Sequence, residues 1–249
     1  IFYWRWDIRK HGDKKPPRLP RPPRSPRPLT LMPTSPTRVV GVDWAAKQWA
    51  CVELTDGAVT NVLGLKSFAQ VVERFDGAAA IGVDIPIGLP VDGPRRRADL
   101  EARSMAGPST VFVTYPQAVY DCPTHGDAVA MCRDKNWPGI SRQSYGLRTH
   151  IQDVAPFGDF VHEVHPEVTF QFMNDGRLGY SKHTWNGFFI RRNLLRERGI
   201  NVPEILSEPL PGVDVLDAAA VAWTAHRIAA GDSLTVPPDP SGTEPTITY

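Results

Sequence analysis

The chain has 249 residues, 41% of them hydrophobic and 22% charged, with a net charge of +1. This length supports one domain with additions, and no apolar run approaches the roughly 20 residues of a membrane-spanning helix. Cys51, Cys122 and Cys132 are too few and too unevenly spaced for a disulfide framework, and Cys122, His125 and Cys132 lack the fourth ligand of a structural zinc site. Composition therefore argues against a membrane protein and a disulfide-rich secreted domain, and it favours a cytoplasmic protein.

Positive charge and proline concentrate at the N-terminus. Residues 1–38 contain ten Lys/Arg, two Asp/Glu and nine of the 25 prolines. Because proline lacks an amide hydrogen and apolar side chains are scarce here, we expect residues 1–37 to form a disordered basic tail. Two alternatives stay open. In the first, the tail is a basic arm that binds nucleic acid. In the second, translation starts at Met32, and residues 1–31 are upstream sequence translated in error.

From Arg38 onward, apolar periodicity predicts an α/β domain over residues 38–232, followed by a C-terminal tail over 233–249. Three strands form an antiparallel meander, and a helix and a continuously apolar fourth strand follow. With the fifth strand they predict a five-stranded mixed sheet flanked by helices, in which the fourth and fifth strands run parallel to the first. A helical, proline-interrupted insertion over 86–157 then precedes a fifth strand and two closing helices. The predicted strands are 38–44, 49–54, 59–64, 78–88 and 159–167, and the predicted helices are 67–75, 95–105, 125–132, 144–154, 184–199 and 214–231.

Four aspartates are predicted to converge. If the first strand is central and the fourth lies parallel beside it, Asp43 and Asp84 emerge at the same end of adjacent strands, where ligands of open α/β sheets collect. Asp214 and Asp217 are three residues apart and share one face of the last helix. Four carboxylates this close repel one another, and Mg²⁺ or Mn²⁺ would neutralise them. The simpler alternative is that each strand-end aspartate only forms local hydrogen bonds.

The order and spacing of several segments resemble an uncharacterised family of predicted nucleases with a ribonuclease H-like fold. The similarity covers about residues 38–240. Where that family has two adjacent acids before its final helix, this chain has Val213 and Asp214, but the Asp-x-x-Asp spacing is retained and is similar to that of Holliday-junction resolvases. The segments that carry the resemblance are 39–54, 81–90 with 95–103, 161–170, 181–195 and 214–228.

The resemblance implies a metal-dependent phosphodiesterase that acts on nucleic acid. In that chemistry two magnesium ions about 4 Å apart activate a water and stabilise the leaving oxygen. Asp43 would bridge the ions, while Asp84 and either Asp214 or Asp217 would bind one each. Glu163, at the end of the fifth strand, is a further candidate catalytic group, or else a strand residue that faces solvent. The sequence His165-Pro166-Glu167 either orients the ligands or simply begins a helix.

Basic side chains could bind substrate phosphates. Arginine offers a fork of donors that suits phosphate oxygens, although Asp99 and Arg103 could instead pair on a helix surface. Gln143 lies in a family-like segment, and we derive no role for it. The candidates are Arg95, Arg96, Arg97, Arg103, Lys182, Arg191 and Arg192.

Two other functions stay open. The first is a phosphotransferase or nucleotide hydrolase of the actin and sugar-kinase type, which shares this strand–Asp–turn opening but usually needs a second domain and a glycine-rich phosphate loop. The second is a noncatalytic scaffold in nucleic-acid processing. Because the body of the chain is net acidic, it offers no broad electropositive surface for duplex binding.

Overall fold

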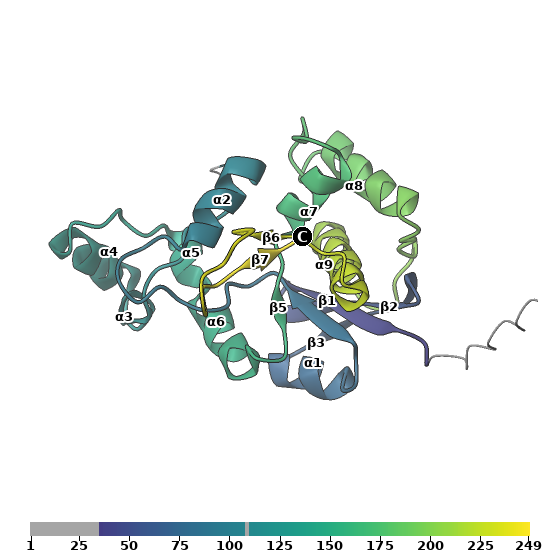
Figure 1. Ribbon diagram of the computed structural model, residues 1–249, viewed down its shortest axis with the longest axis horizontal. Helices are drawn as coiled ribbons and strands as arrows, with labels where there is room; N and C mark the ends of the chain where they lie inside the picture. Colours follow the sequence, from purple (N-terminus) through teal and green to yellow (C-terminus); the bar gives the residue numbers. More distant parts are fainter. Residues whose placement is uncertain (1–34, 108–109) are drawn as a thin grey trace, which may run out of the picture. The chain divides into compact units, whose positions relative to one another are not determined.

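Figure 1 shows the computed structural model, which describes residues 35–107 and 110–249. Residues 36–249 form one unit. The predicted basic tail lies, apart from its last three residues, outside the described ranges. Across those ranges, no helix is long and apolar enough to cross a membrane.

A five-stranded mixed sheet forms the centre of this unit, as predicted. Its strand order is β3-β2-β1-β4-β5. The first three strands form an antiparallel meander, β4 pairs with β1 in parallel, and β5 pairs with β4 in parallel. The strands are β1 (Arg38–Ala45), β2 (Gln48–Thr55), β3 (Ala58–Leu65), β4 (Ala80–Val83) and the short β5 (His162–Glu163).

Two tight turns fix the register of the meander. Ala46 and Lys47 join β1 to β2, and Asp56 and Gly57 join β2 to β3; all four residues have positive φ angles, between 47° and 80°. Two consecutive positive φ angles are the signature of the hairpin turns whose twist matches that of the flanking strands. The meander therefore holds β1 in the middle of the sheet, with one edge open for β4.

Helices follow the predicted order, and the insertion after β4 is helical. Ser67, Thr124, Ser141 and Thr184 each accept a backbone N–H at a helix start, the usual role of a hydroxyl N-cap. Two helices, α3 and α7, are not among the predicted ones, and the predicted helix over 144–154 is divided into α5 and α6. The helices are α1 (Phe68–Arg74), α2 (Arg97–Ala106), α3 (Gln117–Tyr120), α4 (His125–Asp134), α5 (Arg142–Gly146), α6 (Arg148–Val154), the 3₁₀ helix η1 (Ala155–Phe157), α7 (Pro166–Met173), α8 (Trp185–Glu197) and α9 (Gly212–Ala230).

The two faces of the sheet carry separate apolar cores. Val40 and Val42 project to the face covered by α1 and by the insertion, whereas Val39 projects to the face covered by α9. Gly41 lies directly under α9: a Cβ atom there would stand 2.2 Å from the carbonyl oxygen of Ala218. The helix therefore rests on the backbone of β1 itself (Figure 1), and this contact fixes where its first turns lie.

The segment predicted as a C-terminal tail contributes to the fold. Residues 235–236 (β6) and 247–248 (β7) form a two-stranded antiparallel sheet, and Thr248 bridges to Val164. Val236 and Ile247 are buried in a cluster with residues of α2. Residues 233–249 thus extend the domain past the predicted boundary at residue 232.

Candidate metal centre

Asp43 and Asp84 lie side by side on the face of the sheet that α9 covers. In the parallel register Val42 pairs with Val83, and the Asp84 amide donates to the Val42 carbonyl at 3.0 Å. The next residue on each strand is therefore an aspartate, and both project to the same side because partners in register share a face. That side also carries Gly41, on which α9 rests.

Helix α9 brings the second pair of acids to this point. Asp217 directly precedes Ala218, which contacts β1 at Gly41, and its charge acts on Asp43, so its carboxyl group lies near the carboxyl end of β1. Its side chain is 1% exposed, whereas Asp214, one turn earlier, is half-buried. The charges of Asp84, Asp217 and Asp214 all act on Asp43, so these four aspartates lie near one another, and we call them the acidic cluster.

Burial and mutual repulsion disfavour the charged forms in this cluster. Burial is the largest influence on Asp43, and the charges of Asp84 and Asp217 add to it, so its pKa lies well above the ordinary value. Burial also raises the pKa of Asp84 to about 7 and that of Asp217 to about 6, although a nearby ammonium group opposes both shifts. Without a further cation, the cluster therefore holds protons at mildly acidic pH.

The opposing ammonium group belongs to Lys182. This residue precedes α8, which begins at Trp185. Its Nζ donates to Asp217 Oδ2 at 2.5 Å. Burial is the largest single influence and lowers the pKa of Lys182, but the charge and hydrogen bond of Asp217 together with the charges of Asp84 and Asp43 outweigh it, so the net pKa is raised. Lys182 is thus a protonated partner of the cluster, a pairing that the sequence analysis missed.

The acidic cluster has the donor atoms that a divalent cation needs, but its carboxylates are not yet close enough together to coordinate one. Its donors are carboxylate oxygens, the ligands that magnesium prefers, and Asp217 Oδ1 is buried with no hydrogen-bond partner among the described residues. Yet within residues 35–107 and 110–249, no three His, Cys, Asp or Glu side chains are grouped closely enough to hold a metal ion as they stand. Binding would require the carboxylates to draw together and Lys182 to move.

Glu163 does not join the cluster. Glu163 on β5 pairs with Val83 on β4. The Glu163 side chain therefore projects to the face of the sheet opposite to that of Asp84, the residue after Val83. There Arg96 donates to both carboxylate oxygens at 2.6 and 2.7 Å, and the Ile87 amide donates at 2.6 Å. This carboxylate is buried and fully engaged, which fits neither its predicted catalytic role nor the alternative of a strand residue that faces solvent.

Arg96 and Asp99 complete a buried network. Arg96 also donates to Asp99 Oδ1, and Asp99 Oδ2 accepts the Thr114 amide at 2.8 Å. Asp99 thus pairs with Arg96 and not with Arg103, which donates to the Val111 carbonyl. A buried arginine between two acids anchors the insertion to β5 and is not available to a phosphate.

Glu167 and Arg191 form a second buried ion pair. Arg191 donates to both oxygens of Glu167, at 2.9 and 2.7 Å, and its side chain is 4% exposed. A substrate phosphate cannot reach this guanidinium, so the predicted phosphate role of Arg191 does not fit.

His165 precedes α7, with Pro166 in its first turn, so the helix-start interpretation holds. Burial lowers the pKa of His165, and the charges of Glu167 and Asp217 act on it, which puts it beside the cluster.

The remaining predicted residues make no described contact with the acidic cluster. Arg97 pairs with Glu101, Asp239 and Glu244, which ties α2 to the C-terminal segment. Arg95 and Gln143 are exposed. Of the predicted site residues, the structure therefore brings together the four aspartates, Lys182 and His165. The arginines at 95–97 and 103 do not contact them.

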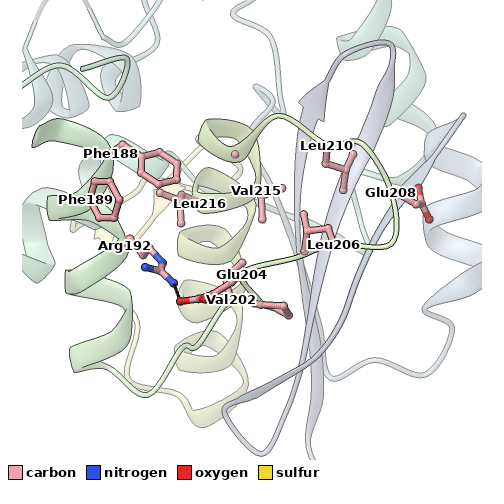
Figure 2. A pocket seen from close by; sticks show the side chains of 12 residues that line it. Phe188, Phe189, Arg192, Val202, Glu204, Leu206, Glu208, Leu210, Val215 and Leu216 are labelled. Atoms are coloured by element: carbon pink, nitrogen blue, oxygen red, sulfur yellow. Dashed lines mark hydrogen bonds and ion pairs between the residues drawn. The ribbon is translucent and has the colours of Figure 1, made fainter. Parts of the chain in front are cut away.

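A pocket of about 460 Å³ lies between α8, α9 and the segment that joins them. Figure 2 shows Phe188 and Phe189 on one side of it and the ion pair between the half-buried Arg192 and the exposed Glu204. On α9 its lining residues include Val215 and Leu216, which stand about half a turn around the helix from the acids at 214 and 217. This pocket and the acidic cluster are therefore on different sides of α9.

Comparison with known proteins gives a family but no characterised relative. No curated protein and no solved structure matched the chain. A family model described as "Protein of unknown function (DUF429)" matched residues 41–242, which span the five-stranded sheet except the first three residues of β1, together with α9 and part of the C-terminal segment. The chain belongs to this family.

Proposed function

We propose that this protein is a divalent-metal-dependent nuclease with a ribonuclease H-like fold, which hydrolyses phosphodiester bonds in DNA or RNA. The observation that carries the proposal is the acidic cluster: adjacent parallel strands deliver Asp43 and Asp84 to one point, and α9 adds Asp217 and Asp214. Lys182 offsets only part of the cost of burying these carboxylates, because their pKa values stay raised beside it, so a divalent cation would stabilise them further.

The sheet topology supports the fold assignment. An antiparallel meander followed by two parallel strands, with the first strand in the centre, is the arrangement that the resemblance to ribonuclease H-like nucleases implies. The position of the acids supports it too, because they lie at the carboxyl end of the parallel strands, where α/β sheets bind ligands.

In the proposed mechanism the four aspartates would hold Mg²⁺ or Mn²⁺, to which a substrate phosphate would bind. When bound, such ions activate a water and stabilise the leaving oxygen of an in-line displacement. Asp43 and Asp84 are fixed by the strand register, so they define the site, whereas Asp214 is half-buried and has room to adjust. His165, kept neutral by burial, can accept or donate one hydrogen bond beside the acids.

The test is cleavage of a panel of single-stranded, duplex and branched DNA and RNA in Mg²⁺ or Mn²⁺. Asp43→Asn and Asp217→Asn keep the side-chain shape and remove the charge, so we expect cleavage to fall by orders of magnitude while the fold persists. Asp175→Asn is the matched control, because Asp175 is exposed and its positive φ angle suits asparagine.

Each outcome of the panel has a separate meaning. Cleavage that survives both substitutions, or excess chelator, would contradict a metal-dependent nuclease at the cluster. Hydrolysis of free nucleotides without strand cleavage would instead favour the phosphotransferase-like alternative. A protein that neither cleaves nor binds metal would fit the scaffold alternative.

A further inference from the structure

The cation at the acidic cluster is a side chain of the protein itself. Lys182 Nζ lies 2.5 Å from Asp217 Oδ2, and the two side chains differ in exposure, with 31% of Lys182 and 1% of Asp217 open to solvent. The ammonium also acts on Asp43, Asp84 and Asp214, whose carboxyl pKa values it lowers against the effect of burial. The ammonium group of Lys182 thus partly neutralises all four aspartates.

We propose that Lys182 is a displaceable counter-ion: it occupies Asp217 in the metal-free protein and leaves when a divalent cation binds. This inference rests on the proposed function. A divalent ion and an ammonium group repel each other, so they cannot share Asp217 without cost. Because Lys182 is a strongly hydrated point charge on a four-carbon stem and is partly exposed, it has both the freedom and the solvent access to move away.

The Glu167–Arg191 pair shows what a permanent buried ion pair looks like in this protein. Both Glu167 oxygens accept from one guanidinium, and both side chains are nearly inaccessible, at 9% and 4%. The Lys182–Asp217 pair differs in exposure and in hydrogen bonding. The Lys182 side chain is partly open to solvent, and Asp217 Oδ1 has no hydrogen-bond partner in the part of the chain that the structure describes. The unpaired oxygen remains available to a metal.

The backbone around Lys182 is held firmly, so displacement needs only its side chain to rotate. Thr184 donates to the Ser181 carbonyl through both its amide and its hydroxyl, and Arg191 donates to the Tyr180 carbonyl. Gly187 packs so closely that a Cβ atom there would collide with the Ser181 carbonyl. The displaced ammonium therefore stays beside the cluster, where a substrate phosphate would attract it.

The experiment compares Mn²⁺ binding by the wild-type protein, Lys182→Met and the control Lys135→Met, by calorimetry and by the Mn²⁺-induced shift in Tm. Lys135 is an exposed lysine on another part of the surface. Removing a competing unit charge should tighten Mn²⁺ binding of Lys182→Met by about tenfold or more and enlarge its Tm shift, while Lys135→Met should match the wild type. Equal or weaker Mn²⁺ binding by Lys182→Met would overturn the proposal.

A second measurement uses the wild-type protein and does not depend on the variant folding. Amine acetylation followed by mass spectrometry reports how accessible each lysine is. We expect Mn²⁺ to raise the labelling rate of Lys182 several-fold and to leave Lys135 unchanged, and an unchanged or lower rate at Lys182 would contradict displacement. If neither the wild type nor Lys182→Met binds Mn²⁺, the proposed function fails; if both bind it equally, only the counter-ion proposal fails.

Discussion

Replacing Asp43 by asparagine isolates the electrostatic cost of the acidic cluster in the metal-free protein. Asp43 is 8% exposed, and its Oδ1 accepts the Trp44 amide at 2.8 Å, a bond that an asparagine carbonyl can also accept. The substitution therefore removes one buried charge and its repulsion of Asp84 and Asp217 while keeping shape and hydrogen bonding. We expect Asp43→Asn to be more stable than the wild type at pH 8 in chelator.

The size of the gain follows from the pKa shifts. Burial raises the pKa of Asp43 well above its ordinary value and the charges of Asp84 and Asp217 raise it further, and each pKa unit corresponds to about 1.4 kcal/mol. Since Lys182 already offsets part of the repulsion, we expect a net gain of about 1–3 kcal/mol, or roughly 2–10 °C in Tm for a domain of this size.

The assay is thermal unfolding of both proteins in chelator at pH 8 and pH 5, with Asp175→Asn as the control. At pH 5 the wild-type carboxyl groups with raised pKa values take up protons and lose their repulsion, so the advantage of Asp43→Asn should shrink. A variant less stable than the wild type at pH 8, or a gain of the same size at both pH values, would refute repulsion within the cluster.

Three further predictions concern stability. Asp84 and Asp217 have raised pKa values in the folded state, so the metal-free wild type should lose stability as pH rises from about 4 through about 7. Urea unfolding midpoints that increase over this pH range would contradict the raised pKa values. Gly41→Ala would force α9 off β1 and should cost about 1–3 kcal/mol or more in unfolding free energy; a Tm equal to that of the wild type would show that the helix is not in direct contact. Arg191→Met would leave Glu167 buried and unpaired and should cost about 3–5 kcal/mol, with partial recovery when Glu167→Gln is added; an unchanged denaturant midpoint for Arg191→Met would show that the pair is not buried in solution.

The position of the aspartates could be predicted because it depends on local rules. Strand alternation and a parallel register put Asp43 and Asp84 on one face, and a three-residue spacing put Asp214 and Asp217 on one side of a helix. The meander and the helix order also follow from turn residues and apolar periodicity. These features need only short stretches of sequence, and the structure bears them out.

The partners of the charged residues could not be predicted, because they join segments far apart in the chain. Lys182 and Asp217 are 35 residues apart, and Arg96 and Glu163 are 67 apart. No periodicity in either segment indicates such a pair. Glu163 also depends on the register of the two-residue strand β5: a shift of one residue would have turned it toward the acids, so its face was not decided by its sequence neighbours.

Direct measurement of Mn²⁺ binding by electron paramagnetic resonance tests most sharply whether the acidic cluster is a metal centre. The wild type should remove free Mn²⁺ signal in a saturable way, and Asp84→Asn should weaken that binding by at least about tenfold, since it deletes the carboxylate that the β1–β4 register fixes beside Asp43. Asp175→Asn should bind as the wild type does. Mn²⁺ binding that is equally strong in Asp84→Asn, or absent in the wild type, would contradict a metal centre at these aspartates.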